Sequence, residues 1–251
     1  MTDSLLLQPA HADLAWLRHV HGGGVGLALD PAARPALLAA EQAVQAIVAH
    51  GDVVYGINTG FGKLAQTVIP PGRLAELQRN LVRSHAVGTG EPLPAPVVRL
   101  VLATKALSLA RGHSGVRPAV VEALLALFNA GLVPRIPAKG SVGASGDLAP
   151  LAHLALVLIG EGMCDTPDGD TVDGAEALRR CGLAPLVLGP KEGLALLNGT
   201  QVSTALALHG LFGAESVFVA GLMAGALSLE AIQGSVRPLD PRIHAARGQP
   251  G

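Results

Sequence analysis

The chain has 251 residues, and its 18 Lys and Arg against 19 Asp and Glu leave a formal net charge of −1. A chain of this length can bury a sizeable core, as one large domain or two small ones. So balanced a charge provides neither a basic field for nucleic acid nor an acidic tail, and we expect no nucleic-acid partner. With 49% hydrophobic but only 2% aromatic residues, the interior is predicted to consist of Ala, Leu, Val and Gly.

The two cysteines, Cys164 and Cys181, are too few and too far apart for a zinc ribbon or a Cys-x-x-Cys redox motif. They are interpreted as ordinary reduced thiols. The start of the chain, residues 1–4, has no positive charge before the short apolar run of residues 5–7, which argues against a signal peptide. These features favour the cytoplasm.

Two long stretches, residues 193–214 and 216–229, contain no charged residue. Their length would allow a membrane span. Polar side chains nevertheless occur there, and between the two stretches, more densely than a helix facing lipid tolerates; they are Asn198, Thr200, Gln201, Ser203, Thr204, His209 and Glu215. We therefore expect a buried helix of a bundle and no membrane partner.

Near the N-terminus, the motif His19-x-His21 is followed by three glycines. Two histidines without a third ligand nearby are a weak metal signal, and the glycines are typical of a turn. We expect a turn here and no metal site. A helix is predicted over residues 30–50, because Asp-Pro stands at its start and a glycine follows its end.

Residues 53–63 indicate a short β-type run that enters a glycine-rich loop. A phosphate-binding loop is excluded, because Ile57 stands where its first glycine belongs and Leu64 follows the lysine. Tyr55 is the single tyrosine of the chain. It lies on this loop, where glycines such as Gly62 allow a ligand to approach the backbone closely.

Hydrophobic spacing and proline starts predict further helices over residues 73–87, 97–111, 117–131, 147–160 and 200–234. Pro134 and Pro137 indicate an extended segment between two of these helices, and residues 163–173 a small hairpin. His85 falls at one predicted helix end and Asn198 just before the last helix. Taken alone, both are ordinary helix-end residues.

The stretch Gly140–Pro150 gathers small residues around Ala144-Ser145-Gly146. In a tight bend, the amide nitrogen of Gly146 can attack the carbonyl carbon of Ala144, because glycine leaves that nitrogen unhindered. Loss of one water on ring closure and a second from the Ser145 hydroxyl would leave an imidazolone with an exocyclic methylidene, which is an electrophile. A serine-hydrolase elbow is excluded, since Asp147 stands where that motif needs glycine.

Three stretches together resemble the signatures of the aromatic amino acid ammonia-lyases and aminomutases: Gly140–Pro150, Tyr55–Gly62 and Lys191–Gln201. They occur in the family's order, and the closing segment 239–251 also resembles it, so the resemblance covers essentially the whole chain. In these enzymes an Ala-Ser-Gly triplet forms 4-methylideneimidazole-5-one. The resemblance implies this self-formed prosthetic group at residues 144–146, with no external cofactor and no metal.

The resemblance also implies roles for individual residues. Tyr55 would remove the substrate's β-proton, and Asn198 would form hydrogen bonds at the prosthetic group and the substrate. Gly62 and His85 would bind the amino acid substrate. The pair Ser84-His85 resembles the histidine-specific branch, which implies elimination of ammonia from L-histidine to give trans-urocanate. Because a free phenol has a pKa of about 10, such a base needs a site that stabilises its anion.

The implied fold is mainly α, a helical lyase fold with long central helices beginning near residue 200 and a small mixed segment around the glycine-rich loops. It predicts an N-terminal domain over residues 1–199, which carries the ring-forming loop (residues 140–147), and the start of a central helical bundle over residues 200–251. Family members continue for about as long again, and that half supplies a second tyrosine, the arginine for the substrate carboxylate and a glutamate near the amine. We expect the N-terminal part of an enzyme that forms a homo-oligomer, a tetramer in the family.

Two other functions stay open. A tyrosine or phenylalanine ammonia-lyase, or an aminomutase, would use the same residues; the substrate and the product, an unsaturated acid or a β-amino acid, distinguish these enzymes. The other is a non-catalytic truncated fragment, because sites in this family are completed by residues from several subunits.

Overall fold

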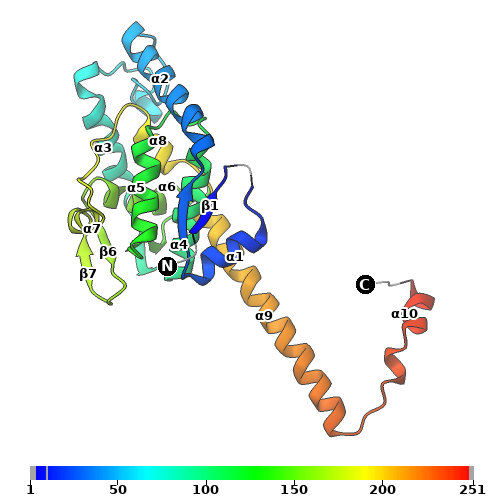
Figure 1. The fold of residues 1–251 in the computed structure, drawn as a ribbon. Helices are drawn as coiled ribbons and strands as arrows, with labels where there is room; N and C mark the ends of the chain where they lie inside the picture. The colour runs from blue at the N-terminus through cyan, green and yellow to red at the C-terminus, as the bar shows by residue number, and fades with distance from the viewer. Residues whose placement is uncertain (1–3, 10, 249–251) are drawn as a thin grey trace. The chain divides into compact units, whose positions relative to one another are not determined.

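Figure 1 presents the computed structural model of the chain, which describes residues 4–9 and 11–248. These residues are mainly helical and form two compact units, the first up to His209 and the second from Gly210. The predicted mainly α fold is confirmed. Residues 1–3, on which the prediction against a signal peptide partly rests, lie outside the described residues, as do the last three residues of the closing segment, 249–251.

Helices make up most of the described chain. The α-helices are α1 (Leu14–Gly22), α2 (Arg34–His50), α3 (Leu74–His85), α4 (Ala95–Ala110), α5 (Pro118–Asn129), α6 (Leu148–Leu158), α7 (Gly174–Arg180), α8 (Glu192–Leu197), α9 (Gln201–Ala231) and α10 (Pro241–Arg247). Short 3-10 helices lie at Pro31–Ala33, Gly62–Leu64, Pro71–Arg73 and Arg237–Leu239. The helices predicted from spacing and proline starts are confirmed, with only their ends shifted.

The strands are short, with two to four residues each. They are β1 (Ser4–Leu7), β2 (Gly26–Leu29), β3 (Thr89–Pro92), β4 (Val133–Pro134), β5 (Pro137–Lys139), β6 (Met163–Asp165) and β7 (Thr171–Asp173). β1 pairs in parallel with β2, β3 pairs antiparallel with β5, and β4, β6 and β7 form an antiparallel sheet in that order. The predicted hairpin is β6–β7, and the predicted extended segment contains β4 and β5.

The turn predicted around the two N-terminal histidines is wrong for the histidines themselves. His19 and His21 lie in the last turn of α1, which begins where the Asp13 carboxylate accepts a hydrogen bond from the Trp16 amide at 2.8 Å. The turn is confined to the glycines after the helix, beginning at Gly23, whose φ is 80°. This helix connects the parallel strands β1 and β2.

The predicted β-type run before the glycine-rich loop is also wrong. The amide of Val54 donates to Oδ1 of Asn58 at 2.9 Å, and Nδ2 of Asn58 donates to the carbonyl of Asp52 at 2.7 Å. This side chain therefore takes up backbone groups that a strand partner would need. The chain turns over residues 55–58 instead, and these turns present Tyr55.

The core of the first unit is built around α4, α5 and α6, which Figure 1 draws in green among the surrounding helices. α4 has buried residues on nearly all its sides, as expected for a helix in a protein interior. It packs against α5, α1 and α2, while α6 packs against α3, α7 and α8. Prolines in the first turns of α4 and α5 fix where these helices begin.

Three helix ends converge in the first unit, because α3, α6 and α8 pack against one another in pairs. α3 ends at His85, α6 begins directly after the ring-forming loop, and α8 ends just before Asn198. Residues that are far apart in the sequence are thereby brought to one place.

The second unit contains the remainder of α9, a 3-10 helix and α10. Large apolar side chains of α9 are exposed in it, among them Val217 (74%), Phe218 (67%) and Leu227 (71%). Within the described residues, one helical stretch, Glu192–Ala231, is long and apolar enough to cross a membrane by length and composition. The burial predicted for this helix is not seen from Gly213 onward, where nearly every residue of α9 is exposed.

Candidate functional site

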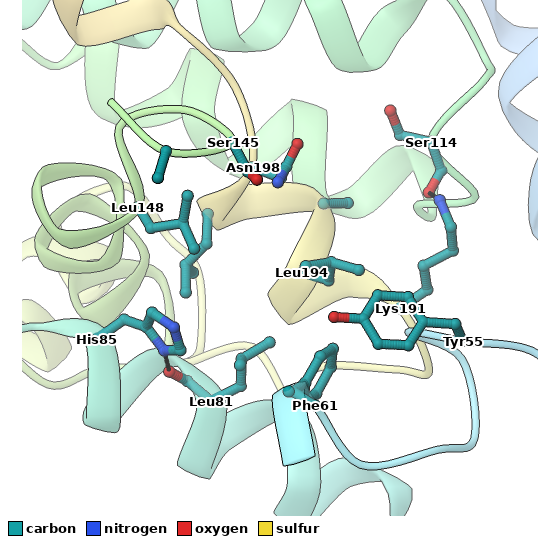
Figure 2. Close-up of a pocket in the computed structure, with 14 residues that line it drawn as sticks. Tyr55, Phe61, Leu81, His85, Ser114, Ser145, Leu148, Lys191, Leu194 and Asn198 are labelled. Carbon is teal, nitrogen blue, oxygen red and sulfur yellow. Dashed lines mark hydrogen bonds between the residues drawn. The ribbon is translucent and has the colours of Figure 1, made fainter. Parts of the chain in front are cut away.

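A cavity of about 490 Å³ lies where these helix ends converge (Figure 2). Its wall is formed by the turns after α2, the end of α3, the ring-forming loop and α8. Most of the predicted site residues line it: Tyr55, Gly62, His85, Ala144, Ser145 and Asn198. Gly146 is not one of the lining residues. The folded chain thus brings residues of all three signatures to one cavity.

The ring-forming loop has an unusual backbone at its centre. Ser145 has a φ of 66° and Gly146 a φ of 115°, and a positive φ is uncommon for a residue with a side chain. A Cβ on Gly146 would lie 2.5 Å from the carbonyl oxygen of Gly199 and 2.9 Å from its nitrogen. Only glycine fits at this position, because it packs directly on the Gly199 backbone.

Asp147 connects the ring-forming loop to the start of α9. Its carboxylate accepts hydrogen bonds from the Ser203 amide (2.8 Å), the Ser203 hydroxyl (2.6 Å) and the Ser141 hydroxyl (2.8 Å), while its own amide donates to the Gly199 carbonyl (2.7 Å). Burial by itself would raise the pKa of Asp147, but the hydrogen bonds from Ser203 and Ser141 outweigh burial and lower that pKa. Although Asp147 stands at the N-cap position of α6, its side chain caps α9 instead.

Asn198 terminates α8, as its position beside Gly199 indicates, and has extended backbone angles (φ −86°, ψ 121°). Its carbonyl oxygen accepts a hydrogen bond of 2.9 Å from Nζ of Lys105 on α4. Lys105 is only 1% exposed, and this burial lowers its pKa to about 7. A buried amine therefore holds the main chain at a residue whose side chain lines the cavity.

Tyr55 packs edge-on against Phe61, with ring centroids 5.7 Å apart and an angle of 78° between the rings. It is 56% exposed, so solvent and a ligand in the cavity can both reach its phenol. The next residue, Gly56, has a φ of 80°, and a Cβ there would meet the Leu194 side chain of α8 at 2.5 Å. This close approach of the turn to α8 positions Tyr55 at the cavity (Figure 2).

His85 presents its imidazole to the cavity from the last turn of α3 (Figure 2). Its Nδ1 lies 2.8 Å from the Leu81 carbonyl oxygen and 3.2 Å from the Ser84 hydroxyl. Because a carbonyl can only accept, Nδ1 donates the hydrogen bond to Leu81, and Nε2 of the neutral ring is an acceptor. The main chain of α3 thus selects the tautomer of His85.

Sequence reasoning missed Lys191, which lines the same cavity. Its Nζ donates to the Ser114 carbonyl at 2.6 Å, and its backbone has a φ of 70° at the start of α8. Burial lowers the pKa of this amine. Its position in the sequence could have indicated this, because Lys191 is the first residue of the third signature and directly precedes α8, whose residues line the cavity.

A buried carboxylate fixes the start of α8. Glu192 is 1% exposed and accepts hydrogen bonds from Nη2 (2.7 Å), Nε (2.9 Å) and the amide (3.0 Å) of Arg117, and from the Gly189 amide (2.7 Å). The side-chain hydrogen bonds with Glu192 raise the pKa of Arg117. One residue later, a Cβ on Gly193 would lie 2.8 Å from Oε1 of Gln78, so α8 approaches α3 closely.

Metal ligands do not cluster in the part of the chain that the structure describes, where no group of three or more His, Cys, Asp or Glu could hold an ion. His21 and His209 form a pair, with Nε2 and Nδ1 2.8 Å apart. Cys164 and Cys181 are free thiols. Burial, with a smaller contribution from the nearby Asp165 charge, raises the pKa of Cys164 to about 12.

The fold is mainly helical, and its cavity is lined by residues of the Ala-Ser-Gly loop together with Tyr55, His85 and Asn198. Both agree with the family that the three signatures resemble. The family model described as aromatic amino acid lyase matches residues 13–251. The chain belongs to this family.

Three individual proteins are similar to this chain. The chain is 67% identical to a histidine ammonia-lyase from Paracidovorax citrulli, over 99% of this chain and 48% of that protein. The crystal structure of histidine ammonia-lyase from Trypanosoma cruzi is 39% identical with a TM-score of 0.90, covering 97% of this chain and 48% of that one. Ergothionase from Treponema denticola, an ergothioneine-degrading enzyme, is 28% identical with a TM-score of 0.91, covering 98% and 49%. The chain spans about half the length of these proteins.

Proposed function

We propose that this chain is part of an ammonia-lyase that removes ammonia non-oxidatively from L-histidine and gives trans-urocanate. The observation that carries the proposal is the cavity in which Tyr55, His85 and Asn198 lie with Ala144 and Ser145. The 67% identity to a histidine ammonia-lyase supports histidine as the substrate. Because the chain spans about half of that relative, the activity is proposed for the whole protein.

The ring-forming loop fits the prosthetic group 4-methylideneimidazole-5-one. The positive φ angles of Ser145 and Gly146 bend the chain, and the absence of a side chain leaves the Gly146 amide unhindered. The contact with Gly199 restricts position 146 to glycine. When formed, the group supplies an electrophile for the substrate's amine. We propose no external cofactor and no metal.

The chain's own residues bind the substrate and move its proton. Tyr55 removes the β-proton, for which its exposed phenol is accessible from the cavity. His85 binds the substrate imidazole. Its Nε2 accepts a hydrogen bond from the N–H of the substrate ring, because Nδ1 already donates its hydrogen to the main chain. Gly62 lets the substrate approach the backbone. The side-chain amide of Asn198 forms hydrogen bonds with the substrate and with the ring-forming loop.

The exposed apolar side chains of α9 support an assembly. A protein in water rarely leaves so many large apolar side chains uncovered, and Val217, Phe218 and Leu227 are more than half exposed. We propose that they are covered in a homo-oligomer, a tetramer as in the family, located in the cytoplasm. The balanced charge supports neither nucleic acid nor a membrane surface as a partner.

Substrate preference tests the proposal directly. Protein of natural length is incubated with L-histidine, L-phenylalanine, L-tyrosine or ergothioneine, and the products are identified by mass. We expect urocanate from histidine, with turnover reduced and preference shifted toward phenylalanine in His85→Phe. His50→Phe, at the exposed end of α2, is the matched control and keeps the histidine preference.

Each alternative predicts a different result. A β-amino acid as product would identify an aminomutase, and faster turnover of phenylalanine or tyrosine by the unaltered protein would identify a lyase for that substrate. No turnover of any substrate would identify a non-catalytic protein. An unchanged preference in His85→Phe would contradict the role of His85.

A further inference from the structure

Lys105 carries a buried amine to which the proposed reaction gives no role. It lies on α4, where most neighbouring residues are buried and apolar, and is itself 1% exposed. Removing an amine from water is costly unless it gains a specific contact. The contact it gains is the hydrogen bond of 2.9 Å from Nζ to the carbonyl oxygen of Asn198.

The peptide units at Asn198 and Gly199 are held from two directions. The Asn198 carbonyl accepts from Lys105, and the Gly199 carbonyl accepts from the Asp147 amide at 2.7 Å. The same Gly199 backbone lies where a Cβ of Gly146 would be, at 2.5 Å. Lys105 therefore holds the Asn198–Gly199 main chain, against which the ring-forming loop is packed, by a hydrogen bond from the protein core.

The hydrogen bond from the Lys105 amine restricts the direction in which the Asn198 carbonyl points, because a buried amine without this contact would leave its donor unsatisfied. Asn198 is the residue at which the chain leaves α8, so the orientation of its peptide determines where both its side chain and Gly199 lie. A shift of a few tenths of an ångström would change the contact between Gly199 and Gly146.

We propose that Lys105 is a positioning residue, which holds the Asn198–Gly199 main chain against the ring-forming loop so that the loop is bent for cyclisation and Asn198 faces the substrate. This inference rests on the proposed function, because it assumes that the loop cyclises. Lys105 touches neither substrate nor reacting atoms and acts through Asn198 and Gly199.

The test is Lys105→Met in protein of natural length. Methionine matches the length of the lysine stem and suits an apolar environment, so the variant removes the hydrogen bond without opening a large cavity. Leu102→Met is the matched control, since Leu102 lies on the same helix, is also 1% exposed and is replaced by the same residue. Both are compared with the unaltered protein by three readouts: the mass of the peptide containing residues 144–146, kcat and KM for histidine, and Tm.

At pH 7, the lower end of the range in which Lys105 changes its charge, we expect Lys105→Met to keep its Tm and KM while the cyclised fraction or kcat falls at least tenfold. Leu102→Met should match the unaltered protein. The inference is overturned if Lys105→Met keeps both the cyclised fraction and kcat within twofold. It is also overturned if activity is lost only in step with Tm, since this would mean a purely structural role. An uncyclised peptide in the unaltered protein would overturn the proposed function and, with it, this inference.

Discussion

Asp147→Ala removes a single carboxylate that joins the ring-forming loop to α9. Asp147 is 1% exposed and accepts three hydrogen bonds, two from Ser203 and one from Ser141. A hydrogen bond to a charged group contributes about 1.5 to 3 kcal/mol, and bonds within one network do not simply add. We therefore expect the free energy of unfolding to fall by about 3 to 5 kcal/mol, less than the largest sum of three separate bonds.

Thermal and urea unfolding measure this loss. For a chain of this size, each kcal/mol lowers Tm by about 2 to 4 °C. Asp147→Asn keeps the shape and one acceptor oxygen, so we expect a smaller loss, about half that of alanine. Asp168→Ala is the matched control, because Asp168 is exposed between β6 and β7; its change should stay within about 0.5 kcal/mol.

The effect of Asp147→Ala depends on pH in a defined direction. Hydrogen bonds lower the folded-state pKa of Asp147 from its ordinary value of 3.8. The stabilisation is therefore fully present above 3.8 and is lost as the pH falls through the lower, folded-state pKa. A loss below about 1 kcal/mol at neutral pH, against the magnitude expected for buried charged hydrogen bonds, would refute this reasoning. So would a difference between the two proteins that does not shrink in acid.

Two further predictions concern buried ionisable groups. Glu192→Ala leaves the partly exposed Arg117 without its partner, so we expect a loss of about 2 to 4 kcal/mol in urea unfolding; an unchanged midpoint would contradict this role for Glu192. Burial lowers the pKa of Lys105 from 10.5 to about 7, so between these values the unfolded chain binds a proton that the folded chain does not. As the pH rises across this window, the free energy of unfolding of the unaltered protein should increase by up to about 1.4 kcal/mol per pH unit relative to that of Lys105→Met. Parallel stability curves of the two proteins would show that Lys105 is not buried as described.

Most helices could be predicted from the sequence because their signals are local. α5, for example, has a proline in its first turn and apolar residues at helical spacing. α1 was missed although Asp13 is a standard N-cap, because the histidines and glycines at its end suggested a turn instead. The strand prediction near Val54 was wrong because the Val54 amide donates its hydrogen bond to the Asn58 side chain instead of to a neighbouring strand.

The candidate site was predictable as a set of residues but not as a set of contacts. Motifs identify Tyr55 and Asn198 through their neighbours in the sequence. By contrast, Asp147 caps a helix whose Ser203 lies 56 positions away, and Lys105 reaches Asn198 across 93 positions. No local pattern encodes such contacts, because they depend on how α4, α6 and α9 pack.

Residues 144–146 are proposed to form the prosthetic group from the chain itself. The most direct measurement is the mass of the peptide that contains them, taken from protein of natural length. We predict a mass lower than the sequence mass by two waters, and an unmodified peptide in Gly146→Ala, whose Cβ would clash with Gly199. An unmodified peptide in the unaltered protein would contradict the account.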